Sequence, residues 1–219
     1  MDQALLDHLL SYLTDRRRDI FKKVLAERTR HFTVVTEDIY QLHNTSAVMR
    51  SCEVFGIQDM HVVEESLGMN LDREIAIGAQ KWVDIQRHDT VSKCVEQLRS
   101  KGYQIIATTP HDDAQSLEDF DVSKKTALFF GREADGASDE VMQCADGYLK
   151  IPMFGFTESL NVSVSAAIIL QNIVSRMRNE NVNWELNKEE CVELEFKWAK
   201  KTIKRVDEII ARFQEQKNL

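Results

Sequence analysis

The stretch that decides the fold is Ile151-Pro-Met-Phe-Gly-Phe-Thr-Glu-Ser-Leu-Asn-Val-Ser-Val-Ser-Ala-Ala-Ile-Ile-Leu170. It starts as the end of an apolar strand, passes through a loop with Pro152 and Gly155, and continues as a helix. Small polar residues gather where loop and helix meet, namely Ser159, Asn161, Ser163 and Ser165. The first backbone N–H groups of a helix have no intrahelical partner, so this junction can bind an anion or a carbonyl-like acceptor. Because open α/β folds bind ligands beyond their strand ends, we expect the ligand site here.

The helix that follows is expected to be buried. One apolar stripe recurs at steps of four, three and four, and comprises Val162, Ala166, Ile169 and Ile173. The remaining faces are apolar as well, through Val164, Ala167, Ile168 and Leu170. A helix that is apolar on all sides is normally enclosed by the protein.

The middle of the chain alternates between short β-branched runs and helical stretches. Strands are expected at Phe32–Thr36, Met60–Glu64, Val83–Arg87, Tyr103–Thr108, Thr126–Phe130 and Tyr148–Ile151. Helices are expected at Thr45–Phe55, Leu71–Gly78, Val91–Ser100, Ser138–Cys144 and Leu160–Asn179. This alternation predicts an α/β fold with a mostly parallel sheet that helices cover on both faces.

The two ends of the chain have a different, helical pattern. Residues 3–28 predict two helices, with Thr14-Asp15 as a cap between them. Near the other end, apolar residues recur at alternating steps of four and three, at Val192, Phe196, Ala199, Ile203, Val206, Ile210 and Phe213. This heptad seam needs a partner, either the N-terminal helices of the same chain or a second copy. We therefore expect an N-terminal helical extension at 1–30, a central domain at 31–180 and a C-terminal helical extension at 181–219.

Composition excludes several classes of protein. The 219 residues carry 29% charged side chains, which argues against disorder, and no apolar run reaches the roughly 20 residues of a membrane span. Asp2 and Asp7 stand where a signal peptide would be basic, so we expect a cytoplasmic protein. The four cysteines are far apart and lack metal-ligand spacing, which predicts free thiols and no metal.

The net charge of −8 argues against a general nucleic-acid binder, because affinity for phosphate depends on cations. The cations are nevertheless grouped. One basic block contains Arg16, Arg17, Arg18, Lys22, Lys23, Arg28 and Arg30, and a second contains Lys197, Lys200, Lys201, Lys204 and Arg205. Such runs are more often solvated helix faces than binding surfaces, and both interpretations stay open at this point.

Three segments stand in order along the chain: Asn44-Thr-Ser-Ala47-Val-Met-Arg50, Gly131-Arg-Glu133-Ala-Asp-Gly136, and the segment from Pro152 to Ser163. Together they resemble the three motifs of the SpoU-type methyltransferases of the SPOUT superfamily, whose third motif runs Pro-Met-x-Gly-x-x-x-Ser-Leu-Asn-Val-Ser. The third motif is matched here by Pro152, Met153, Gly155, Ser159, Leu160, Asn161, Val162 and Ser163. The resemblance covers roughly residues 32–178.

This resemblance implies an α/β-knot fold, in which a deep C-terminal trefoil knot forms the cofactor pocket, and a homodimer. It implies S-adenosylmethionine as cofactor, bound through main-chain contacts at Thr108, Gly131, Ile151, Met153 and Leu160. The substrate would be RNA, because the reaction needs a ribose 2′-hydroxyl. Within the family, the chain is most similar to members that methylate guanosine 18 of tRNA.

The resemblance also implies a catalytic set, Asn44, Arg50, Glu133, Ser159 and Asn161. Without it, Arg50 is equally well an ordinary surface arginine paired with Glu53 or Glu133, and Asn44 and Asn161 are helix caps. A guanidinium is effectively never deprotonated, so Arg50 does not suit the role of a general base. We expect it to bind a phosphate and to stabilise the developing alkoxide. The family further implies contacts with tRNA phosphate at Arg176 and Arg178. If the chain is an RNA-modifying enzyme, we expect Arg16, Arg17, Arg18 and Arg28 of the first basic block to bind tRNA as well.

The chain departs from the family pattern in two places. Leu42 replaces a usual proline, and the loop residues Phe154, Phe156, Thr157 and Glu158 differ from the usual aliphatic-Gly-Met-x-Gln sequence. Glu158 would bring negative charge to a substrate rich in phosphate. Two alternatives therefore remain: the same chemistry on ribosomal RNA or on the wobble nucleotide of tRNA, and an RNA-binding relative that has lost catalysis.

Overall fold

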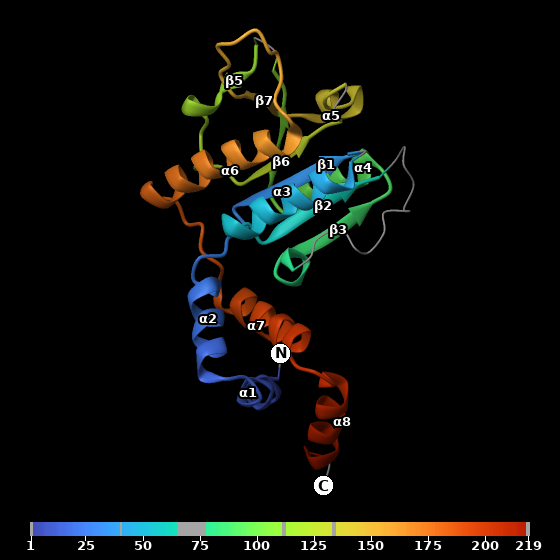
Figure 1. Cartoon of the computed structure of the whole chain (residues 1–219), viewed down its shortest axis with the longest axis vertical. Helices are drawn as coiled ribbons and strands as arrows, with labels where there is room; N and C mark the ends of the chain where they lie inside the picture. Colours follow the sequence, from blue (N-terminus) through green and yellow to red (C-terminus); the bar gives the residue numbers. More distant parts are fainter. Residues whose placement is uncertain (1, 40, 65–77, 111–112, 133–134, 218–219) are drawn as a thin grey trace. The chain divides into compact units, whose positions relative to one another are not determined.

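The computed structural model describes residues 2–39, 41–64, 78–110, 113–132 and 135–217 (Figure 1). The chain divides into two compact units. The first comprises both ends of the chain, Met1–Arg28 and Glu185–Leu219, and the second is Thr29–Trp184. No helix in the described parts of the chain is long and apolar enough to cross a membrane.

The central unit is built on a parallel sheet of seven strands. In chain order these are β1 (Phe32–Glu37), β2 (Asp59–Val63), β3 (Asp84–His88), β4 (Gln104–Thr108), β5 (Gln115–Ser116), β6 (Thr126–Phe130) and β7 (Gly147–Lys150). Their spatial order is β3-β2-β1-β6-β4-β7-β5, and each neighbouring pair is parallel. All carboxyl ends therefore lie along one edge of the sheet, where ligands bind in open α/β folds.

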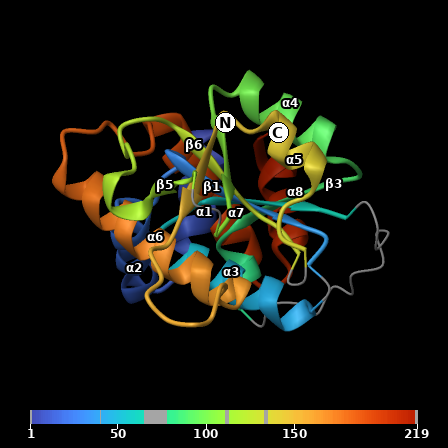
Figure 2. The ribbon, with the colours of Figure 1, turned by 90° about the horizontal axis from the view of Figure 1, so that it is seen from above.

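Helices cover both faces of this sheet, as expected. On one face, α3 (Leu42–Val54) and α6 (Val162–Asn179) pack side by side, and on the other lie α4 (Val91–Ser100) and α5 (Asp139–Cys144) (Figure 2). Strand β1 is buried along its whole length because it contributes to both layers: Val34 faces the α3–α6 core and Val35 the α4–α5 core. The polar residues of β1, namely Thr33, Thr36 and Glu37, are buried together with the apolar ones.

The predicted strands are all present, with shifts of about one residue at their ends, as is usual for boundaries read from hydrogen bonds. Strand β5 was not expected, because two residues cannot show an alternating pattern. Two short 3₁₀ turns, η1 (Ala79–Lys81) and η2 (Leu117–Asp119), were also not expected. The helix expected at Leu71–Gly78 lies outside the described residues except for its last position. The trefoil knot stays a prediction.

Helix α6 corrects one expectation. It buries Ala166, Ile169 and Ile173 against the sheet as the stripe predicts, but it is not enclosed on all sides. Val164 and Ile168 are 44% and 38% exposed, and Leu160, just before the helix, is 41% exposed. Val164 and Ile168 are four residues apart and lie on the same face of α6, and Leu160 precedes the helix; we call these three residues the exposed stripe.

The described residues of the unit made by the two ends form helices joined by short connections, without a β-strand. It contains α1 (Gln3–Ser11), α2 (Asp15–Leu25), α7 (Lys188–Thr202) and α8 (Val206–Lys217). Thr14 caps α2 as predicted, since its hydroxyl accepts from the Arg17 N–H. Helices α7 and α8, which carry the heptad seam, pack on the N-terminal helices of the same chain, and the ring of the seam residue Phe213 lies 4.8 Å from that of His8. Trp198, which is outside the seam, packs against Phe21. The seam is nevertheless broken into two helices, because Ile203 is extended and Arg205 is left-handed.

Candidate active site

Three of the expected cofactor residues follow three neighbouring strands. Thr108 ends β4, Gly131 follows β6, and Ile151 follows β7. The Thr108 hydroxyl donates to the Phe129 carbonyl at 2.9 Å, which ties the end of β4 to β6. Main-chain groups that three adjacent strand ends present together are suited to bind one ligand.

Position 131 has room for glycine only, because a side chain would collide with the backbone. A Cβ at this position would lie 2.1 Å from the Ala137 nitrogen and 2.3 Å from the Gly136 oxygen. The described residues 131–132 and 135–138, which we call the turn 131–138, lie against each other, with hydrogen bonds in both directions between Arg132 and Gly136, at 2.9 and 3.0 Å. The turn brings main-chain groups close together at the edge of the sheet, where no side chain fits.

The first and third motifs meet through two asparagines. The Asn161 side-chain amide donates to the Asn44 side-chain oxygen at 3.2 Å, although 117 residues separate them. Asn44 is buried and also donates to the Gln41 side chain at 3.3 Å. Helices α3 and α6 are therefore joined at their first turns, beside the strand ends.

The capping roles of these two residues differ from each other. Asn161 caps α6, as predicted, because its side-chain oxygen accepts from the Ser163 N–H at 2.9 Å. The expectation that Asn44 is an N-cap is wrong, since α3 begins at Leu42 and Gln41 holds the cap position. A buried Asn44 inside the first turn is available for side-chain contacts across to α6.

Arg50 is exposed on α3, about 9 Å along the helix axis from Asn44. It makes no side-chain hydrogen bond or ion pair with any residue that the structure describes. The alternative interpretation, in which Arg50 pairs with Glu53, is therefore not borne out. Glu133 lies outside the described residues. Ser159, in the loop before α6, is exposed, while Met153 is half-buried.

Sequence reasoning missed three charged residues of this region. Glu37 ends the buried strand β1, Asp38 follows it, and both are themselves buried. Asp38 pairs with Arg132 at 3.1 Å, and Glu37 accepts from the Ser138 N–H at 3.0 Å. Two consecutive acids at the end of a buried strand were the signal available in the sequence, because a buried carboxylate needs a partner.

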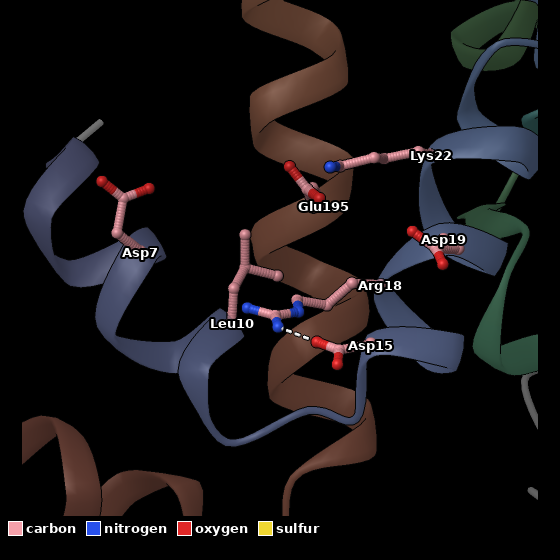
Figure 3. Close-up of a pocket in the computed structure, with 7 residues that line it drawn as sticks. All are labelled: Asp7, Leu10, Asp15, Arg18, Asp19, Lys22 and Glu195. Atoms are coloured by element: carbon pink, nitrogen blue, oxygen red, sulfur yellow. Dashed lines mark hydrogen bonds and ion pairs between the residues drawn. The ribbon is translucent and has the colours of Figure 1, made fainter.

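The expected RNA-binding residues fall into two groups. Arg16 and Arg17 are exposed on α2. Arg18 pairs with Asp15 and lines an open cavity of about 390 Å³ together with Lys22. The other charged residues that line this cavity are acidic, namely Asp7, Asp15, Asp19 and Glu195 (Figure 3). Because acidic and basic side chains both line it, the cavity does not present a uniformly basic surface to phosphate.

The remaining three arginines are held by the protein itself. Arg28 is 1% exposed, with its guanidinium 5.7 Å from the centre of the Trp198 ring, which does not suit direct phosphate contact. Arg176 donates to the carbonyls of Leu117 and Phe120, at 3.1 and 2.6 Å. Arg178 lies over the ring of Trp184, at 4.6 Å. Each has a structural role that its position in the sequence did not indicate.

A buried histidine pair lies on the outer strands of the sheet. His61 Nδ1 and His88 Nε2 are 2.8 Å apart, and Cys94 completes a group whose donor atoms all lie within 4.8 Å of one another. Burial raises the pKa of the Cys94 thiol to about 12, so the thiol is protonated when no cation is bound to it. The hydrogen-bonded rings form a neutral polar contact between β2 and β3.

This pair predicts a loss of stability in mild acid. Burial, with smaller effects of His88 and Lys101, lowers the pKa of His61 from 6.5 to about 3. Below pH 6.5 His61 is protonated in the unfolded chain but stays neutral in the folded chain. The free energy of unfolding therefore falls by about 1 kcal/mol per pH unit.

Urea unfolding near pH 7 and pH 5 measures this fall, and His61→Gln is expected to lose less stability between the two pH values than the parent does. An equal loss in both proteins would contradict it; His43→Gln, at an exposed position, is the control.

Comparison with known proteins gives the class. Residues 31–171 match the profile of the SpoU rRNA Methylase family. A tRNA (guanosine(18)-2′-O)-methyltransferase of Borreliella burgdorferi is 36% identical over 90% of this chain and 90% of its own. One of the same name from Aquifex aeolicus is 31% identical over 87% of this chain and 92% of its own. The chain belongs to the SpoU methylase family and is a methyltransferase.

Solved structures agree with this fold. The A. aeolicus TrmH/SpoU tRNA modifying enzyme superposes with a TM-score of 0.76 and 29% identity, over 87% of this chain and 98% of that one. A structure described as concerning 2-OH methylation of C/U34 on tRNA gives a TM-score of 0.60 and 25% identity. It covers 97% of that chain but only 68% of this one.

Proposed function

We propose that this protein transfers a methyl group from S-adenosylmethionine to the ribose 2′-hydroxyl of guanosine 18 in tRNA. The observation that carries the proposal is the Asn44–Asn161 hydrogen bond, which joins the first and third motifs at the carboxyl edge of the sheet. The substrate follows from relatives named for guanosine 18, which match this chain over 90% and 87% of its length.

The residues present fit the cofactor. A turn in which even a Cβ is excluded at Gly131 lets main-chain groups approach a ligand closely. Main-chain groups of Thr108, Ile151, Met153 and Leu160 would hold the adenosyl part from the neighbouring strand ends and loop. When bound, S-adenosylmethionine supplies an activated methyl group, so the protein's task is alignment and exclusion of water.

Arg50 is assigned the electrostatic role in this chemistry. The 2′-hydroxyl becomes a better nucleophile as negative charge develops on its oxygen, and a nearby guanidinium stabilises that charge. Arg50 is exposed and has no partner among the described residues, so it is available to an incoming ribose and its phosphate. Ser159 and Asn161 would position the substrate, with Asn161 held by Asn44. The catalytic role of Glu133 remains a proposal drawn from the family resemblance.

We assign the tRNA contacts to Arg16 and Arg17, with Arg18 beside them. Replacing both Arg16 and Arg17 by glutamine is expected to weaken tRNA binding and to reduce the slope of log affinity against log salt by about 1.5. Filter binding over a range of salt concentrations measures this. Lys93→Gln combined with Lys124→Gln removes the same charge from exposed ion pairs in the central unit. If both double variants kept the parental slope, the block would be a solvated helix face.

A homodimer is part of the proposal. The exposed stripe of Leu160, Val164 and Ile168, on and before α6, is an apolar surface in contact with water. Exposed apolar surfaces of this kind mark sites where another protein binds. Phe154 and Phe156 in the preceding loop are fully exposed as well. A second copy of the chain would cover these residues beside the active site, and sedimentation equilibrium would measure the mass. The protein would act in the cytoplasm and without a metal.

The decisive test uses labelled S-adenosylmethionine and unmodified tRNA transcripts that carry either guanosine or 2′-deoxyguanosine at position 18. Label is expected in the first transcript only, because the second lacks the acceptor oxygen. Equal labelling of both would move the target to another nucleotide, the wobble position included. No labelling, with cofactor bound, would indicate ribosomal RNA or a non-catalytic RNA-binding relative.

A further inference from the structure

Two consecutive acids at the end of β1 are buried in a place where charge is costly. Glu37 and Asp38 are 2% and 1% exposed. A buried carboxylate is tolerated only when it is paired and hydrogen-bonded. Asp38 Oδ2 accepts from an Arg132 guanidinium nitrogen at 3.1 Å, and Glu37 Oε2 accepts from the Ser138 N–H at 3.0 Å.

Both partners belong to the turn 131–138, which follows β6. Arg132 comes directly after Gly131 and is closed on Gly136 by two main-chain hydrogen bonds. At the other end, Ser138 caps α5, where its hydroxyl accepts from the Val141 N–H at 3.3 Å. The two acids therefore hold this turn near its beginning and at its end.

The backbone of Asp38 is specialised for this contact. Its φ of 43° lies in the left-handed region, which non-glycine residues other than Asn and Asp rarely adopt. Its N–H donates to the Val63 carbonyl at 2.9 Å, so the end of β1 is also tied to β2. An aspartate therefore suits this position both for its backbone and for its charge.

We propose that the Asp38–Arg132 ion pair positions the turn 131–138 for cofactor binding. It holds Gly131 at the distance from the β4 and β7 ends that S-adenosylmethionine requires, and so sets the affinity for the cofactor. The inference rests on the proposed function, because it takes the ligand of Gly131 to be S-adenosylmethionine.

A second ion pair offers a matched control. Glu64, at the end of β2, accepts from Arg87 of β3 at 3.0 and 2.9 Å. The side-chain exposures of this pair are 1% and 38%, close to the 1% and 25% of Asp38 and Arg132. The Glu64–Arg87 pair links β2 and β3, whereas the turn 131–138 follows β6, on the other side of β1. Loss of either pair should destabilise the fold, but only one should affect the cofactor.

The experiment compares Arg132→Gln, Arg132→Lys, Asp38→Asn and Arg87→Gln by calorimetric titration with S-adenosylmethionine and by thermal unfolding. Asparagine tolerates the left-handed backbone, so Asp38→Asn removes only the charge. Arg132→Gln and Asp38→Asn are expected to raise the Kd about tenfold, because a misplaced turn loses several contacts together. Arg132→Lys should recover part of the affinity, and the KM for the cofactor should rise more than kcat falls.

Arg87→Gln is expected to lower the Tm to a similar extent with an unchanged Kd. If Asp38→Asn fails to fold, the two Arg132 variants decide. A parental Kd in Arg132→Gln would overturn the inference and leave the proposed function standing. Equal rises in Kd for Arg132→Gln and Arg87→Gln would also overturn it. A parental protein that does not bind S-adenosylmethionine would overturn the proposed function and this inference with it.

Discussion

Replacing Arg50 by alanine is expected to lower kcat for methyl transfer by about 10³-fold or more, because one preorganised charge at the developing alkoxide is removed. Cofactor binding should remain nearly intact, since Arg50 lies on α3 and the proposed cofactor contacts follow β4, β6 and β7. Single-turnover kinetics with labelled cofactor measure the first effect and calorimetry the second. Little loss of stability is expected, because Arg50 is exposed and is not paired within the described chain.

Two further variants sharpen this result. Arg50→Lys keeps the positive charge but cannot form the bidentate hydrogen bonds of a guanidinium, so an intermediate rate is expected. Arg99→Ala removes an exposed arginine whose partners are Cys144 and Asp146, away from the strand ends, and should leave turnover unchanged. If Arg50→Ala retained turnover, the electrostatic role assigned to Arg50 would be wrong.

Gly131→Ala is expected to raise the Kd for S-adenosylmethionine about a hundredfold. The new methyl carbon would lie 2.1 Å from the Ala137 nitrogen and 2.2 Å from the Gly136 carbon, and both are backbone atoms. Because backbone cannot rotate away as a side chain does, the whole turn must move, and small displacements in a preorganised site have large effects. Calorimetric titration measures the change.

Gly147→Ala is the control for this prediction. It adds the same methyl group in β7, where the nearest atom is the flexible Ile106 Cδ1 at 3.2 Å. We expect a Kd within a few-fold of the parent. A parental Kd in Gly131→Ala would mean that the turn 131–138 does not form the cofactor site, and it would remove the main support for the fit of S-adenosylmethionine.

Some elements could be predicted with their true bounds. Thr126–Phe130 and Val91–Ser100 have the same limits in the sequence analysis and in the structure. The strand is an unbroken apolar run behind two lysines, and the helix has apolar residues at helical spacing behind the capping Thr90. In such segments the local pattern and the tertiary environment favour the same structure, so the sequence is sufficient.

Other features could not be predicted, because they depend on which segments meet. Asn44 was expected to cap its helix, and only its contact with Asn161 shows why a buried asparagine belongs there. Arg28 was grouped with exposed arginines, since its neighbours along the chain do not indicate that Trp198 covers it. The exposed face of α6 was also missed, because an apolar residue has the same pattern whether it faces a core or a second molecule.

The sequence by itself determined the parallel α/β fold, the edge of the sheet at which the site lies, and the motifs that identify the family. Periodicity, caps and turn residues act over a few positions, so these features can be recognised without knowing the partners. Only the tertiary structure decided that Asp38 holds Arg132, 94 residues away, and that Asn161 holds Asn44. Such pairs form because the strand order brings β1 beside β6 and packs α3 against α6, and no local pattern specifies that order.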